Sequence, residues 1–370
     1  MNNPKTKILC VLHRPPPEHG AAVIGKLISD NENFNNEFQC HYITIESSET
    51  ISDIGTFNFK KIILFFKLFF KVSLQLLSFR PNKVYFTSSI KGFAFYRDLI
   101  LSFSWRFYKL FKSIDIYHHY HTKGVQQFVA KSKRNLSLTS FFLKDVNLIL
   151  LSPKLEKDFE LVRTFKKVFI LPNCIEHTFS KQAFDICISE KYKSDKQYIA
   201  LFMGHMLESK GYLDVLQCAI DLKNDGIHFY FAGGWADIED ERNFNDIVNK
   251  ENISHIVHHH GFVSGEQKEN LFKEADIFIY PTKDDAFPLV LIEALSYGLP
   301  ILSSNEGGIS SILDDKCGYI FEKNAKISNI LNNYKKNSHF MDVALYCRQR
   351  YDDNFSKERF EGNLLKIFNA

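Results

Sequence analysis

The chain has 370 residues, of which 45% are apolar and 24% are charged. This composition is typical of globular proteins, so it excludes a mainly disordered chain, and the length favours two domains. The formal net charge is only +3. However, the segment 57–135 carries 15 basic residues and two acidic ones, which leaves the rest of the chain acidic. This asymmetry predicts a basic surface that faces a partner.

Seven cysteines are scattered along the chain and never form a Cys-x-x-Cys pair. This pattern argues against a disulfide framework or a zinc site and favours a reducing cytoplasm. The first apolar run, of about six residues, is too short for a signal peptide and is typical of a strand. The most apolar stretch, 62–79, is interrupted by Lys67 and Lys71, so we expect no transmembrane helix.

Short apolar runs alternate with longer helical patterns, as in parallel sheets covered by helices on both faces. Two series of runs, separated by a polar stretch at 176–196 that we interpret as a linker, predict an α/β protein with two doubly wound domains. The domains are expected at 1–180 and 190–351. The expected strands are 7–12, 40–44, 83–87, 114–120, 147–151 and 167–171, then 197–203, 227–232, 256–259, 276–280 and 300–303.

The most informative segment, residues 275–304, reads ADIFIYPTKDDAFPLVLIEALSYGLPILSS. A strand ends at Tyr280, a polar loop follows, and Pro288 is of a type favoured at the start of a helix. Asp285 lies at the mouth of this helix, and Glu293 lies eight residues later, inside it. Amides at a helix N-terminus attract anions such as phosphate. The segment therefore indicates an anion-binding site at the carboxyl end of a parallel strand.

This segment resembles the signature of family 4 glycosyltransferases, which have the GT-B fold of two Rossmann-like domains facing across a cleft. The family pattern EGFPLVLLEAMACGLPVV is matched here by DAFPLVLIEALSYGLPIL. The resemblance covers nearly the whole chain, and it implies that a last helix at 352–370 rejoins the N-terminal domain. Further resembling segments, in the family's order, are LFMGHMLESKGYLDVL, YFAGGW, HHHGFVSGEQ, NEGGISSILDDKCGYIF and DDNFSKERF.

Four positions depart from the family pattern. His205 replaces a usual arginine, Asp285 is shorter than the usual glutamate, Ser311 stands near the place of another glutamate, and Cys174 replaces a glycine. An imidazole lacks the bidentate fork of a guanidinium and is mostly neutral at pH 7.

The resemblance implies a nucleoside-diphosphate-sugar donor. Lys210, His205 and the amides of the helix that begins after Pro288 would support the leaving diphosphate. Glu293 would hold the ribose hydroxyls, and Asp285 would contact the donor sugar. Family members retain the anomeric configuration and usually need no metal, so we expect no cofactor and no metal site. The other expected donor-binding positions are Gly233, Phe262, Val263, Phe287, Pro288 and Leu289.

The N-terminal half offers two further candidates. Gly20 and Ala21 start a helix and resemble the family's glycine loop, although a plain strand-to-helix turn explains them as well. The pattern is neither that of a dinucleotide-binding loop nor that of a P-loop. After the strand at 114–120, a period of two places His119 and His121 on one face. The family often has a histidine there, so His121 is the expected catalytic residue and His119 the second choice, whereas His118 is expected to be structural.

The basic segment carries Lys60, Lys67 and Lys71 at helical spacing among Phe and Leu residues. One interpretation is a helix packed on the sheet with its lysines in water. The other is docking on an anionic membrane surface. No nucleic-acid-binding motif is present, so no nucleic-acid partner is expected.

These observations predict a retaining glycosyltransferase that moves a sugar to a hydroxyl of a glycan or lipid-linked acceptor. We expect it to act in bacterial surface polysaccharide or lipopolysaccharide biosynthesis, in the cytoplasm and peripherally on the inner face of the plasma membrane. Two alternatives stay open: a nucleotide-sugar epimerase or hydrolase on the same fold, and a non-catalytic, degenerate family member that acts as a binding subunit.

Overall fold

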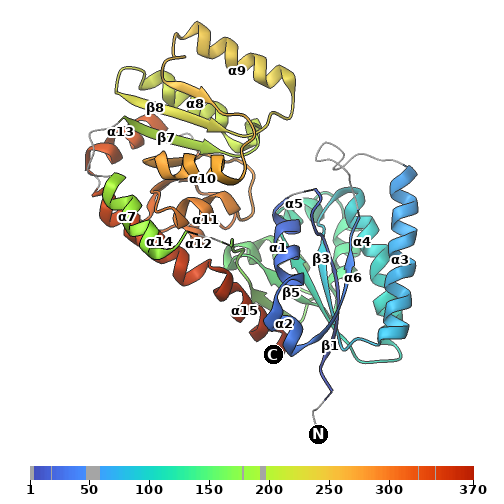
Figure 1. Cartoon of the computed structure of the whole chain (residues 1–370). Coiled ribbons are helices and arrows are strands. Elements are labelled where there is room, and N and C mark those ends of the chain that lie inside the picture. The colour runs from blue at the N-terminus through green and yellow to red at the C-terminus, as the bar shows by residue number, and fades with distance from the viewer. Residues whose placement is uncertain are drawn as a thin grey trace. The chain divides into compact units, whose positions relative to one another are not determined.

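The computed structural model describes residues 4–17, 19–46, 59–176, 179–191, 197–323, 325–337 and 339–370 (Figure 1). The chain divides into two compact units. Unit 1 comprises Met1–Asn173 and Glu358–Ala370, and unit 2 comprises Cys174–Lys357. Unit 1 ends at 173 instead of the expected 180, unit 2 begins at 174 instead of 190, and the return to unit 1 is at 358 instead of 352.

Unit 1 is built on a six-stranded sheet in the order β2-β1-β3-β4-β5-β6, with every neighbouring pair parallel. The chain reverses its direction of winding between β1 and β3, and ligands bind at such switch points in open α/β sheets. The strands are β1 (Lys7–Leu12), β2 (Gln39–Thr44), β3 (Lys83–Ser88), β4 (Asp115–Tyr120), β5 (Asn147–Leu150) and β6 (Lys167–Ile170).

Helices cover the unit 1 sheet, and the large core side chains include Trp105, Phe86 and Phe142, none of them exposed. The helices are α1 (Gly20–Ser29), α2 (Glu32–Glu37), α3 (Phe59–Phe79), α4 (Gly92–Lys109), α5 (Val125–Ala130), α6 (Lys133–Leu143), the 3₁₀ helix η2 (Pro153–Val162) and α15 (Lys357–Asn369).

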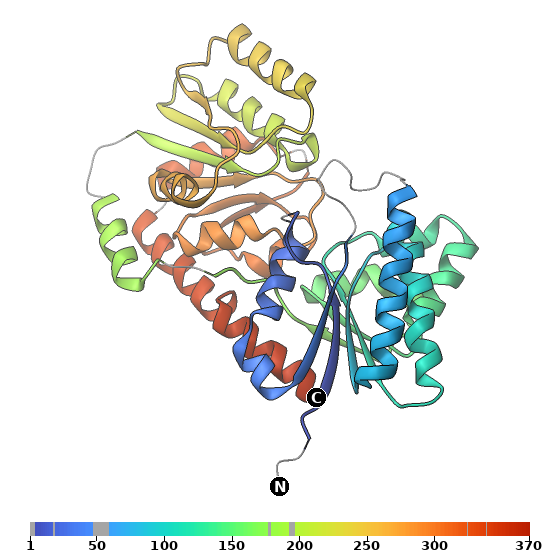
Figure 2. The ribbon, with the colours of Figure 1, turned by 45° about the vertical axis from the view of Figure 1, so that its right-hand side comes forward.

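The last helix, α15, completes unit 1. It lies beside α2 in both views of the ribbon (Figure 2). The ring of Phe368 lies with its centroid 5.3 Å from that of Phe34 and 4.7 Å from that of Tyr117. The ammonium group of Lys83 donates a hydrogen bond to the carbonyl oxygen of Phe368 at 2.5 Å. The two ends of the chain therefore share one core.

Unit 2 has a second parallel sheet in the order β12-β11-β10-β7-β8-β9, which is the strand order of a Rossmann fold. Its strands are β7 (Tyr198–Met203), β8 (Ile227–Ala232), β9 (Val257–His259), β10 (Ile277–Tyr280), β11 (Ile301–Ser304) and β12 (Gly318–Phe321). Its helices are α7 (Lys181–Lys191), η3 (Glu208–Lys210), α8 (Tyr212–Asp221), α9 (Ile238–Lys250), α10 (Gly265–Glu274), α11 (Leu289–Ser296), α12 (Ile309–Ile312), α13 (Ile327–Asn337) and α14 (Phe340–Asn354).

The α/β fold class predicted from the sequence is confirmed, and every expected strand is present with ends within one residue. The linker interpretation of 176–196 is wrong for its central part, which forms α7. This helix packs Phe184 and Ile188 against Ala344 in a small apolar cluster of unit 2. Because only two apolar side chains of α7 make this contact and most of its other residues are polar, the sequence pattern did not indicate a packed helix.

The prediction that the chain has no transmembrane helix concerns a stretch that lies in α3. The stretch Ile62–Phe79 of α3, with a mean hydropathy of 1.8, is long and apolar enough to cross a membrane by length and composition alone. In unit 1, however, one side of this helix packs on the sheet. Leu68, Val72 and Leu76 are buried in the same core cluster as Leu9 and Val11 of β1.

Candidate functional site

The loop 281–288, between β10 and α11, carries the first acid of the signature. Two turns hold it from either side. A Cβ atom at Gly211, whose φ is +86°, would overlap the carbonyl group of Pro281. A Cβ atom at Gly307, whose φ is +53°, would overlap the carbonyl oxygen of Asp285. Gly211 and Gly307 therefore allow both turns to lie directly against this loop.

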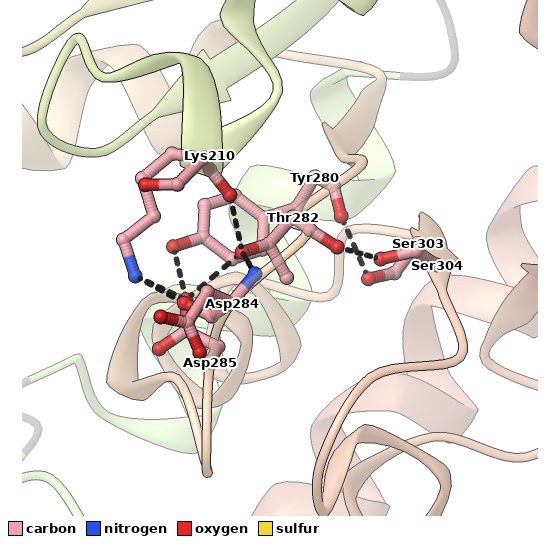
Figure 3. Close-up of polar contacts among 8 residues, drawn as sticks. Lys210, Tyr280, Thr282, Asp284, Asp285, Ser303 and Ser304 are labelled. Carbon is pink, nitrogen blue, oxygen red and sulfur yellow. Dashed lines mark hydrogen bonds and ion pairs between the residues drawn. The ribbon is translucent and has the colours of Figure 1, made fainter. Parts of the chain in front are cut away.

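Asp285 is the centre of a polar network in this loop (Figure 3). Its Oδ2 accepts hydrogen bonds from the Tyr280 hydroxyl at 2.8 Å and the Thr282 hydroxyl at 3.3 Å. The same oxygen forms an ion pair with Lys210 Nζ at 2.7 Å, and this ammonium group also donates to the carbonyl oxygen of Asp284 at 3.0 Å. Lys210 is thus held in place before any ligand binds.

Burial, and then the charge of Asp285, raise the pKa of the Tyr280 hydroxyl well above its usual range. Tyr280 therefore stays protonated and keeps donating to Asp285. Two serines of the neighbouring strand fix the loop further (Figure 3). Ser303 donates to the carbonyl oxygen of Tyr280 at 2.8 Å, and Ser304 donates to that of Thr282 at 2.5 Å.

Glu293 lies inside α11, where its carboxylate pairs with Lys268 Nζ of α10 at 2.5 Å. Both side chains are about a quarter to a third exposed, so a ligand can reach them. Sequence reasoning missed Lys268, because one lysine in a polar helix carries no signal of its own. The structure thus places each signature acid beside a lysine from another element.

The remaining expected donor-binding residues have varied environments. His205 is exposed, and so is Phe262, with 74% of its surface accessible. Gly233 has a φ of +154° and lies so close to the Gly204 carbonyl that a Cβ atom would overlap it. Val263 is half-buried. Pro288 caps α11, with Phe287 buried before it and Leu289 half-buried after it.

A cavity of about 600 Å³ also borders the loop 281–288. It is lined by residues of the loop after β10, of the ends of β11 and β12 and of α8 and α13, including Thr282 and Glu306. Lys210, Asp285 and Glu293 do not line it.

In unit 1, His121 follows the end of β4. Its ring centroid lies 4.0 Å from that of His119, whose Nδ1 is 2.7 Å from the Tyr85 hydroxyl. Burial, with repulsion from His19, lowers the pKa of His121 to about 3, and the side chain of Asn173 opposes this shift. His121 is therefore a neutral imidazole at pH 7.

Three residues near His121 were not predicted from the sequence: His13, His19 and Arg97. Burial lowers the pKa of His13 to about 3, with further repulsion from Arg97, His19 and His121. The rings of His13 and His19 lie 5.4 Å apart. His13 lies in the loop after β1, His19 lies just before α1, and Arg97 lies in α4. These elements are neighbours only because of the strand order β1-β3-β4 in the sheet.

His19 also caps α1, which begins at the predicted Gly20 and Ala21. Its Nδ1 accepts a hydrogen bond from the backbone amide of Ala22 at 3.3 Å. One turn later, at Gly25, α1 lies so close to the preceding loop that a Cβ atom would overlap the His13 carbonyl.

A carboxylate from another element supports the turn after His121. Asp158 of η2 accepts hydrogen bonds from the backbone amides of Gly124, Val125 and Gln126 at 2.6, 2.8 and 2.9 Å. This arrangement satisfies the free amides at the start of α5. Among the residues that the structure describes, no group of three His, Cys, Asp or Glu side chains could hold a metal ion.

Comparison with known proteins relates part of this chain to a known family. Residues 187–344 match the model of the glycosyl transferases group 1 family. Over 133 residues, which are 33% of this chain and 32% of the relative, the chain is 24% identical to the putative colanic acid biosynthesis glycosyltransferase WcaL of Escherichia coli K12. The chain spans from about a third to about half of the length of the curated relatives that it matches.

Solved structures are similar over nearly the whole chain. Anabaena HepE in complex with UDP has a TM-score of 0.71 at 11% identity, covering 98% of this chain and 100% of that one. The lipopolysaccharide outer core galactosyltransferase WaaB has a TM-score of 0.69 at 16% identity, covering 98% and 99%. The chain therefore has the GT-B fold, and its residues 187–344 are similar to the group 1 glycosyl transferases.

Proposed function

We propose that this chain is a retaining glycosyltransferase that moves a sugar from a nucleoside diphosphate to a hydroxyl of a glycan or lipid-linked glycan acceptor. The observation that carries the proposal is the pairing of Lys210 with Asp285 beside the start of α11, within the segment that matches the family. The names of WcaL and WaaB support a role in surface polysaccharide or lipopolysaccharide assembly.

The donor diphosphate would lie near Lys210 and the first amides of α11. Negative charge develops on the diphosphate as it leaves, and a cation already held in place stabilises that charge without reorganisation. Asp285 and the Asp284 carbonyl hold Lys210 for this purpose. Since His205 is exposed and lacks the guanidinium fork of the usual arginine, Lys210 would carry most of the cationic support.

The two acids would orient the rest of the donor. All three hydrogen-bonding partners of Asp285 converge on Oδ2, which leaves Oδ1 for a sugar hydroxyl. Glu293, oriented by Lys268, would accept hydrogen bonds from the ribose hydroxyls. In unit 1, neutral His121 would donate or accept one hydrogen bond in the reaction but would not supply positive charge. Gly233, Phe262 and Val263 would contact the nucleoside.

We also propose a cytoplasmic location. All seven cysteines are free, which fits a reducing compartment.

The first test is a thermal-shift screen of the full chain with UDP, GDP and ADP and their sugars. UDP is the natural starting point because HepE was solved with it. A ligand at 100 times its Kd stabilises a protein by about 2.7 kcal/mol, so the correct base should stand out. Lys210→Ala should abolish most of the shift, whereas Lys283→Ala, which removes an exposed lysine from the same loop, should not.

The second test distinguishes transfer from its alternatives. With labelled donor, a transferase gives labelled acceptor, whereas a hydrolase releases free sugar without acceptor and an epimerase changes the donor itself. NMR of the product would show whether the anomeric configuration is retained. Nucleotide binding without turnover would support the non-catalytic alternative, and the absence of any nucleotide-dependent shift would refute the proposal.

A further inference from the structure

Helix α3 is apolar on two opposite sides. One side is buried in unit 1 through Leu68, Val72 and Leu76. The other points away from the sheet, and its residues recur at intervals of three and four, which places them in one stripe. Their exposed fractions lie between 48% and 68%; they are Ile63, Phe66, Phe70, Leu74 and Leu77.

Helix α4 repeats this arrangement. It lies beside α3 on the unit 1 sheet, as both views show (Figures 1 and 2). Among the residues that the structure describes, eleven of the nineteen exposed large apolar side chains belong to these two helices and the turn after α4. We call this surface the α3–α4 face. Its members from α4 and the turn after it are Phe93, Ile100, Phe103, Phe107, Leu110 and Phe111. The ring centroid of Phe141, in α6, lies 5.5 Å from that of Phe103.

Basic side chains accompany these apolar stripes. Lys67 and Lys71 of α3 are exposed and lie one helical turn before Phe70 and Leu74, at the edge of the stripe. Helix α3 contains no acid, and the one acid of α4, Asp98, is fully buried. The α3–α4 face therefore combines apolar surface with positive charge that no exposed acid of these helices offsets.

We propose that the α3–α4 face docks flat on an anionic lipid bilayer, with Phe and Leu side chains inserted and lysines at the head groups. Charge decides against a second copy of the chain, because a two-fold contact would bring the lysines of both copies together. The buried side of α3 decides against a membrane-spanning helix, because crossing would remove Leu68, Val72 and Leu76 from the core. The inference is independent of the proposed sugar transfer, since it concerns a surface and not the donor site.

The test measures flotation of the full chain with vesicles, without nucleotide. We expect strong binding to equimolar phosphatidylcholine and phosphatidylglycerol, weak binding to phosphatidylcholine alone, and release by 0.5 M salt or alkaline carbonate. Lys67→Gln with Lys71→Gln should weaken binding roughly 25-fold, from about fivefold for each cation.

The apolar contribution is tested with Phe66→Gln, Phe70→Gln, Phe107→Gln and Phe111→Gln together, which should reduce binding at least tenfold. The matched control changes four exposed apolar residues elsewhere to Gln, namely Leu161, Ile186, Ile238 and Met341, and should bind like the parent. Circular dichroism checks that each variant is folded.

Three results would overturn the proposal. Equal binding to both vesicle types would remove the anionic lipid as the partner. Resistance to salt and carbonate would indicate a spanning helix. A parent dimer that the phenylalanine variant converts to monomer would assign the face to self-association. None of these results bears on nucleotide binding, so the proposed function is judged separately.

Discussion

The buried imidazole of His118 allows the electrostatics of unit 1 to be tested. His118 has no exposed surface, and its ring centroid lies 4.6 Å from that of Phe142 and 5.5 Å from that of Phe86. In the described part of the chain, neither ring nitrogen has a hydrogen-bond partner. Burial, with a smaller repulsion from Arg106, lowers its pKa to about 3.

We expect His118→Leu to make unit 1 less sensitive to acid. Below pH 6.5 the unfolded chain takes up a proton at this position, whereas the folded chain does so only near pH 3. Stability is therefore fully present above pH 6.5 and is lost as the pH falls from 6.5 toward 3. Between pH 7.0 and 5.5 one such histidine costs about 1 kcal/mol of unfolding free energy, which the variant should not lose.

The assay is urea unfolding at pH 7.0 and 5.5. The chain has two tryptophans, Trp105 in unit 1 and Trp235 in unit 2, so a Trp235→Phe background makes fluorescence report on unit 1. Comparing the same variant at two pH values cancels any difference in packing between Leu and His. If parent and variant lost equal stability between the two pH values, His118 would titrate alike in both states and the reasoning would be refuted.

Two further changes test how the loops are held. Gly211→Ala should cost at least about 1 kcal/mol of stability by urea unfolding, because the added Cβ meets Pro281, whereas Gly226→Ala, at a φ of +66° with open space around it, should cost less; equal costs would exclude the clash. Asp158→Ala removes three hydrogen bonds to amides at the start of α5 and should cost about 1.5–3 kcal/mol, with faster amide exchange at Gly124; unchanged exchange there would contradict this role.

Most of the fold was predictable because parallel strands buried on both faces are continuous apolar runs. Strand β12 was absent from the series of expected strands because it is a short edge strand, with Tyr319 53% exposed. Helix α7 was missed because only two of its apolar side chains, Phe184 and Ile188, are buried against a distant partner. Local patterns carry little information where few side chains are buried.

The candidate site was predictable only where it is continuous in sequence. Asp285 and Glu293 share one strand-loop-helix segment whose spacing is informative. Lys268, 25 residues before its partner Glu293, could not be found, because its ion pair depends on how α10 packs beside α11. The histidines near His121 depend in the same way on the order of the strands. The basic segment was predicted, and an outward apolar side of α3 belonged to one of its two interpretations. The side chain of Lys60 lies outside the described part.

The contribution of α15 to unit 1 has a consequence for synthesis on the ribosome. Translation proceeds at about 5–20 residues per second, so roughly 10 to 40 s separate the completion of Asn173 from that of α15. Throughout that interval the surface formed by Phe34, Phe38 and Tyr117 lacks Phe368. The nascent first unit therefore exposes these aromatic side chains while the second unit is being synthesised. A chaperone that protects unit 1 from aggregation would be expected to bind there.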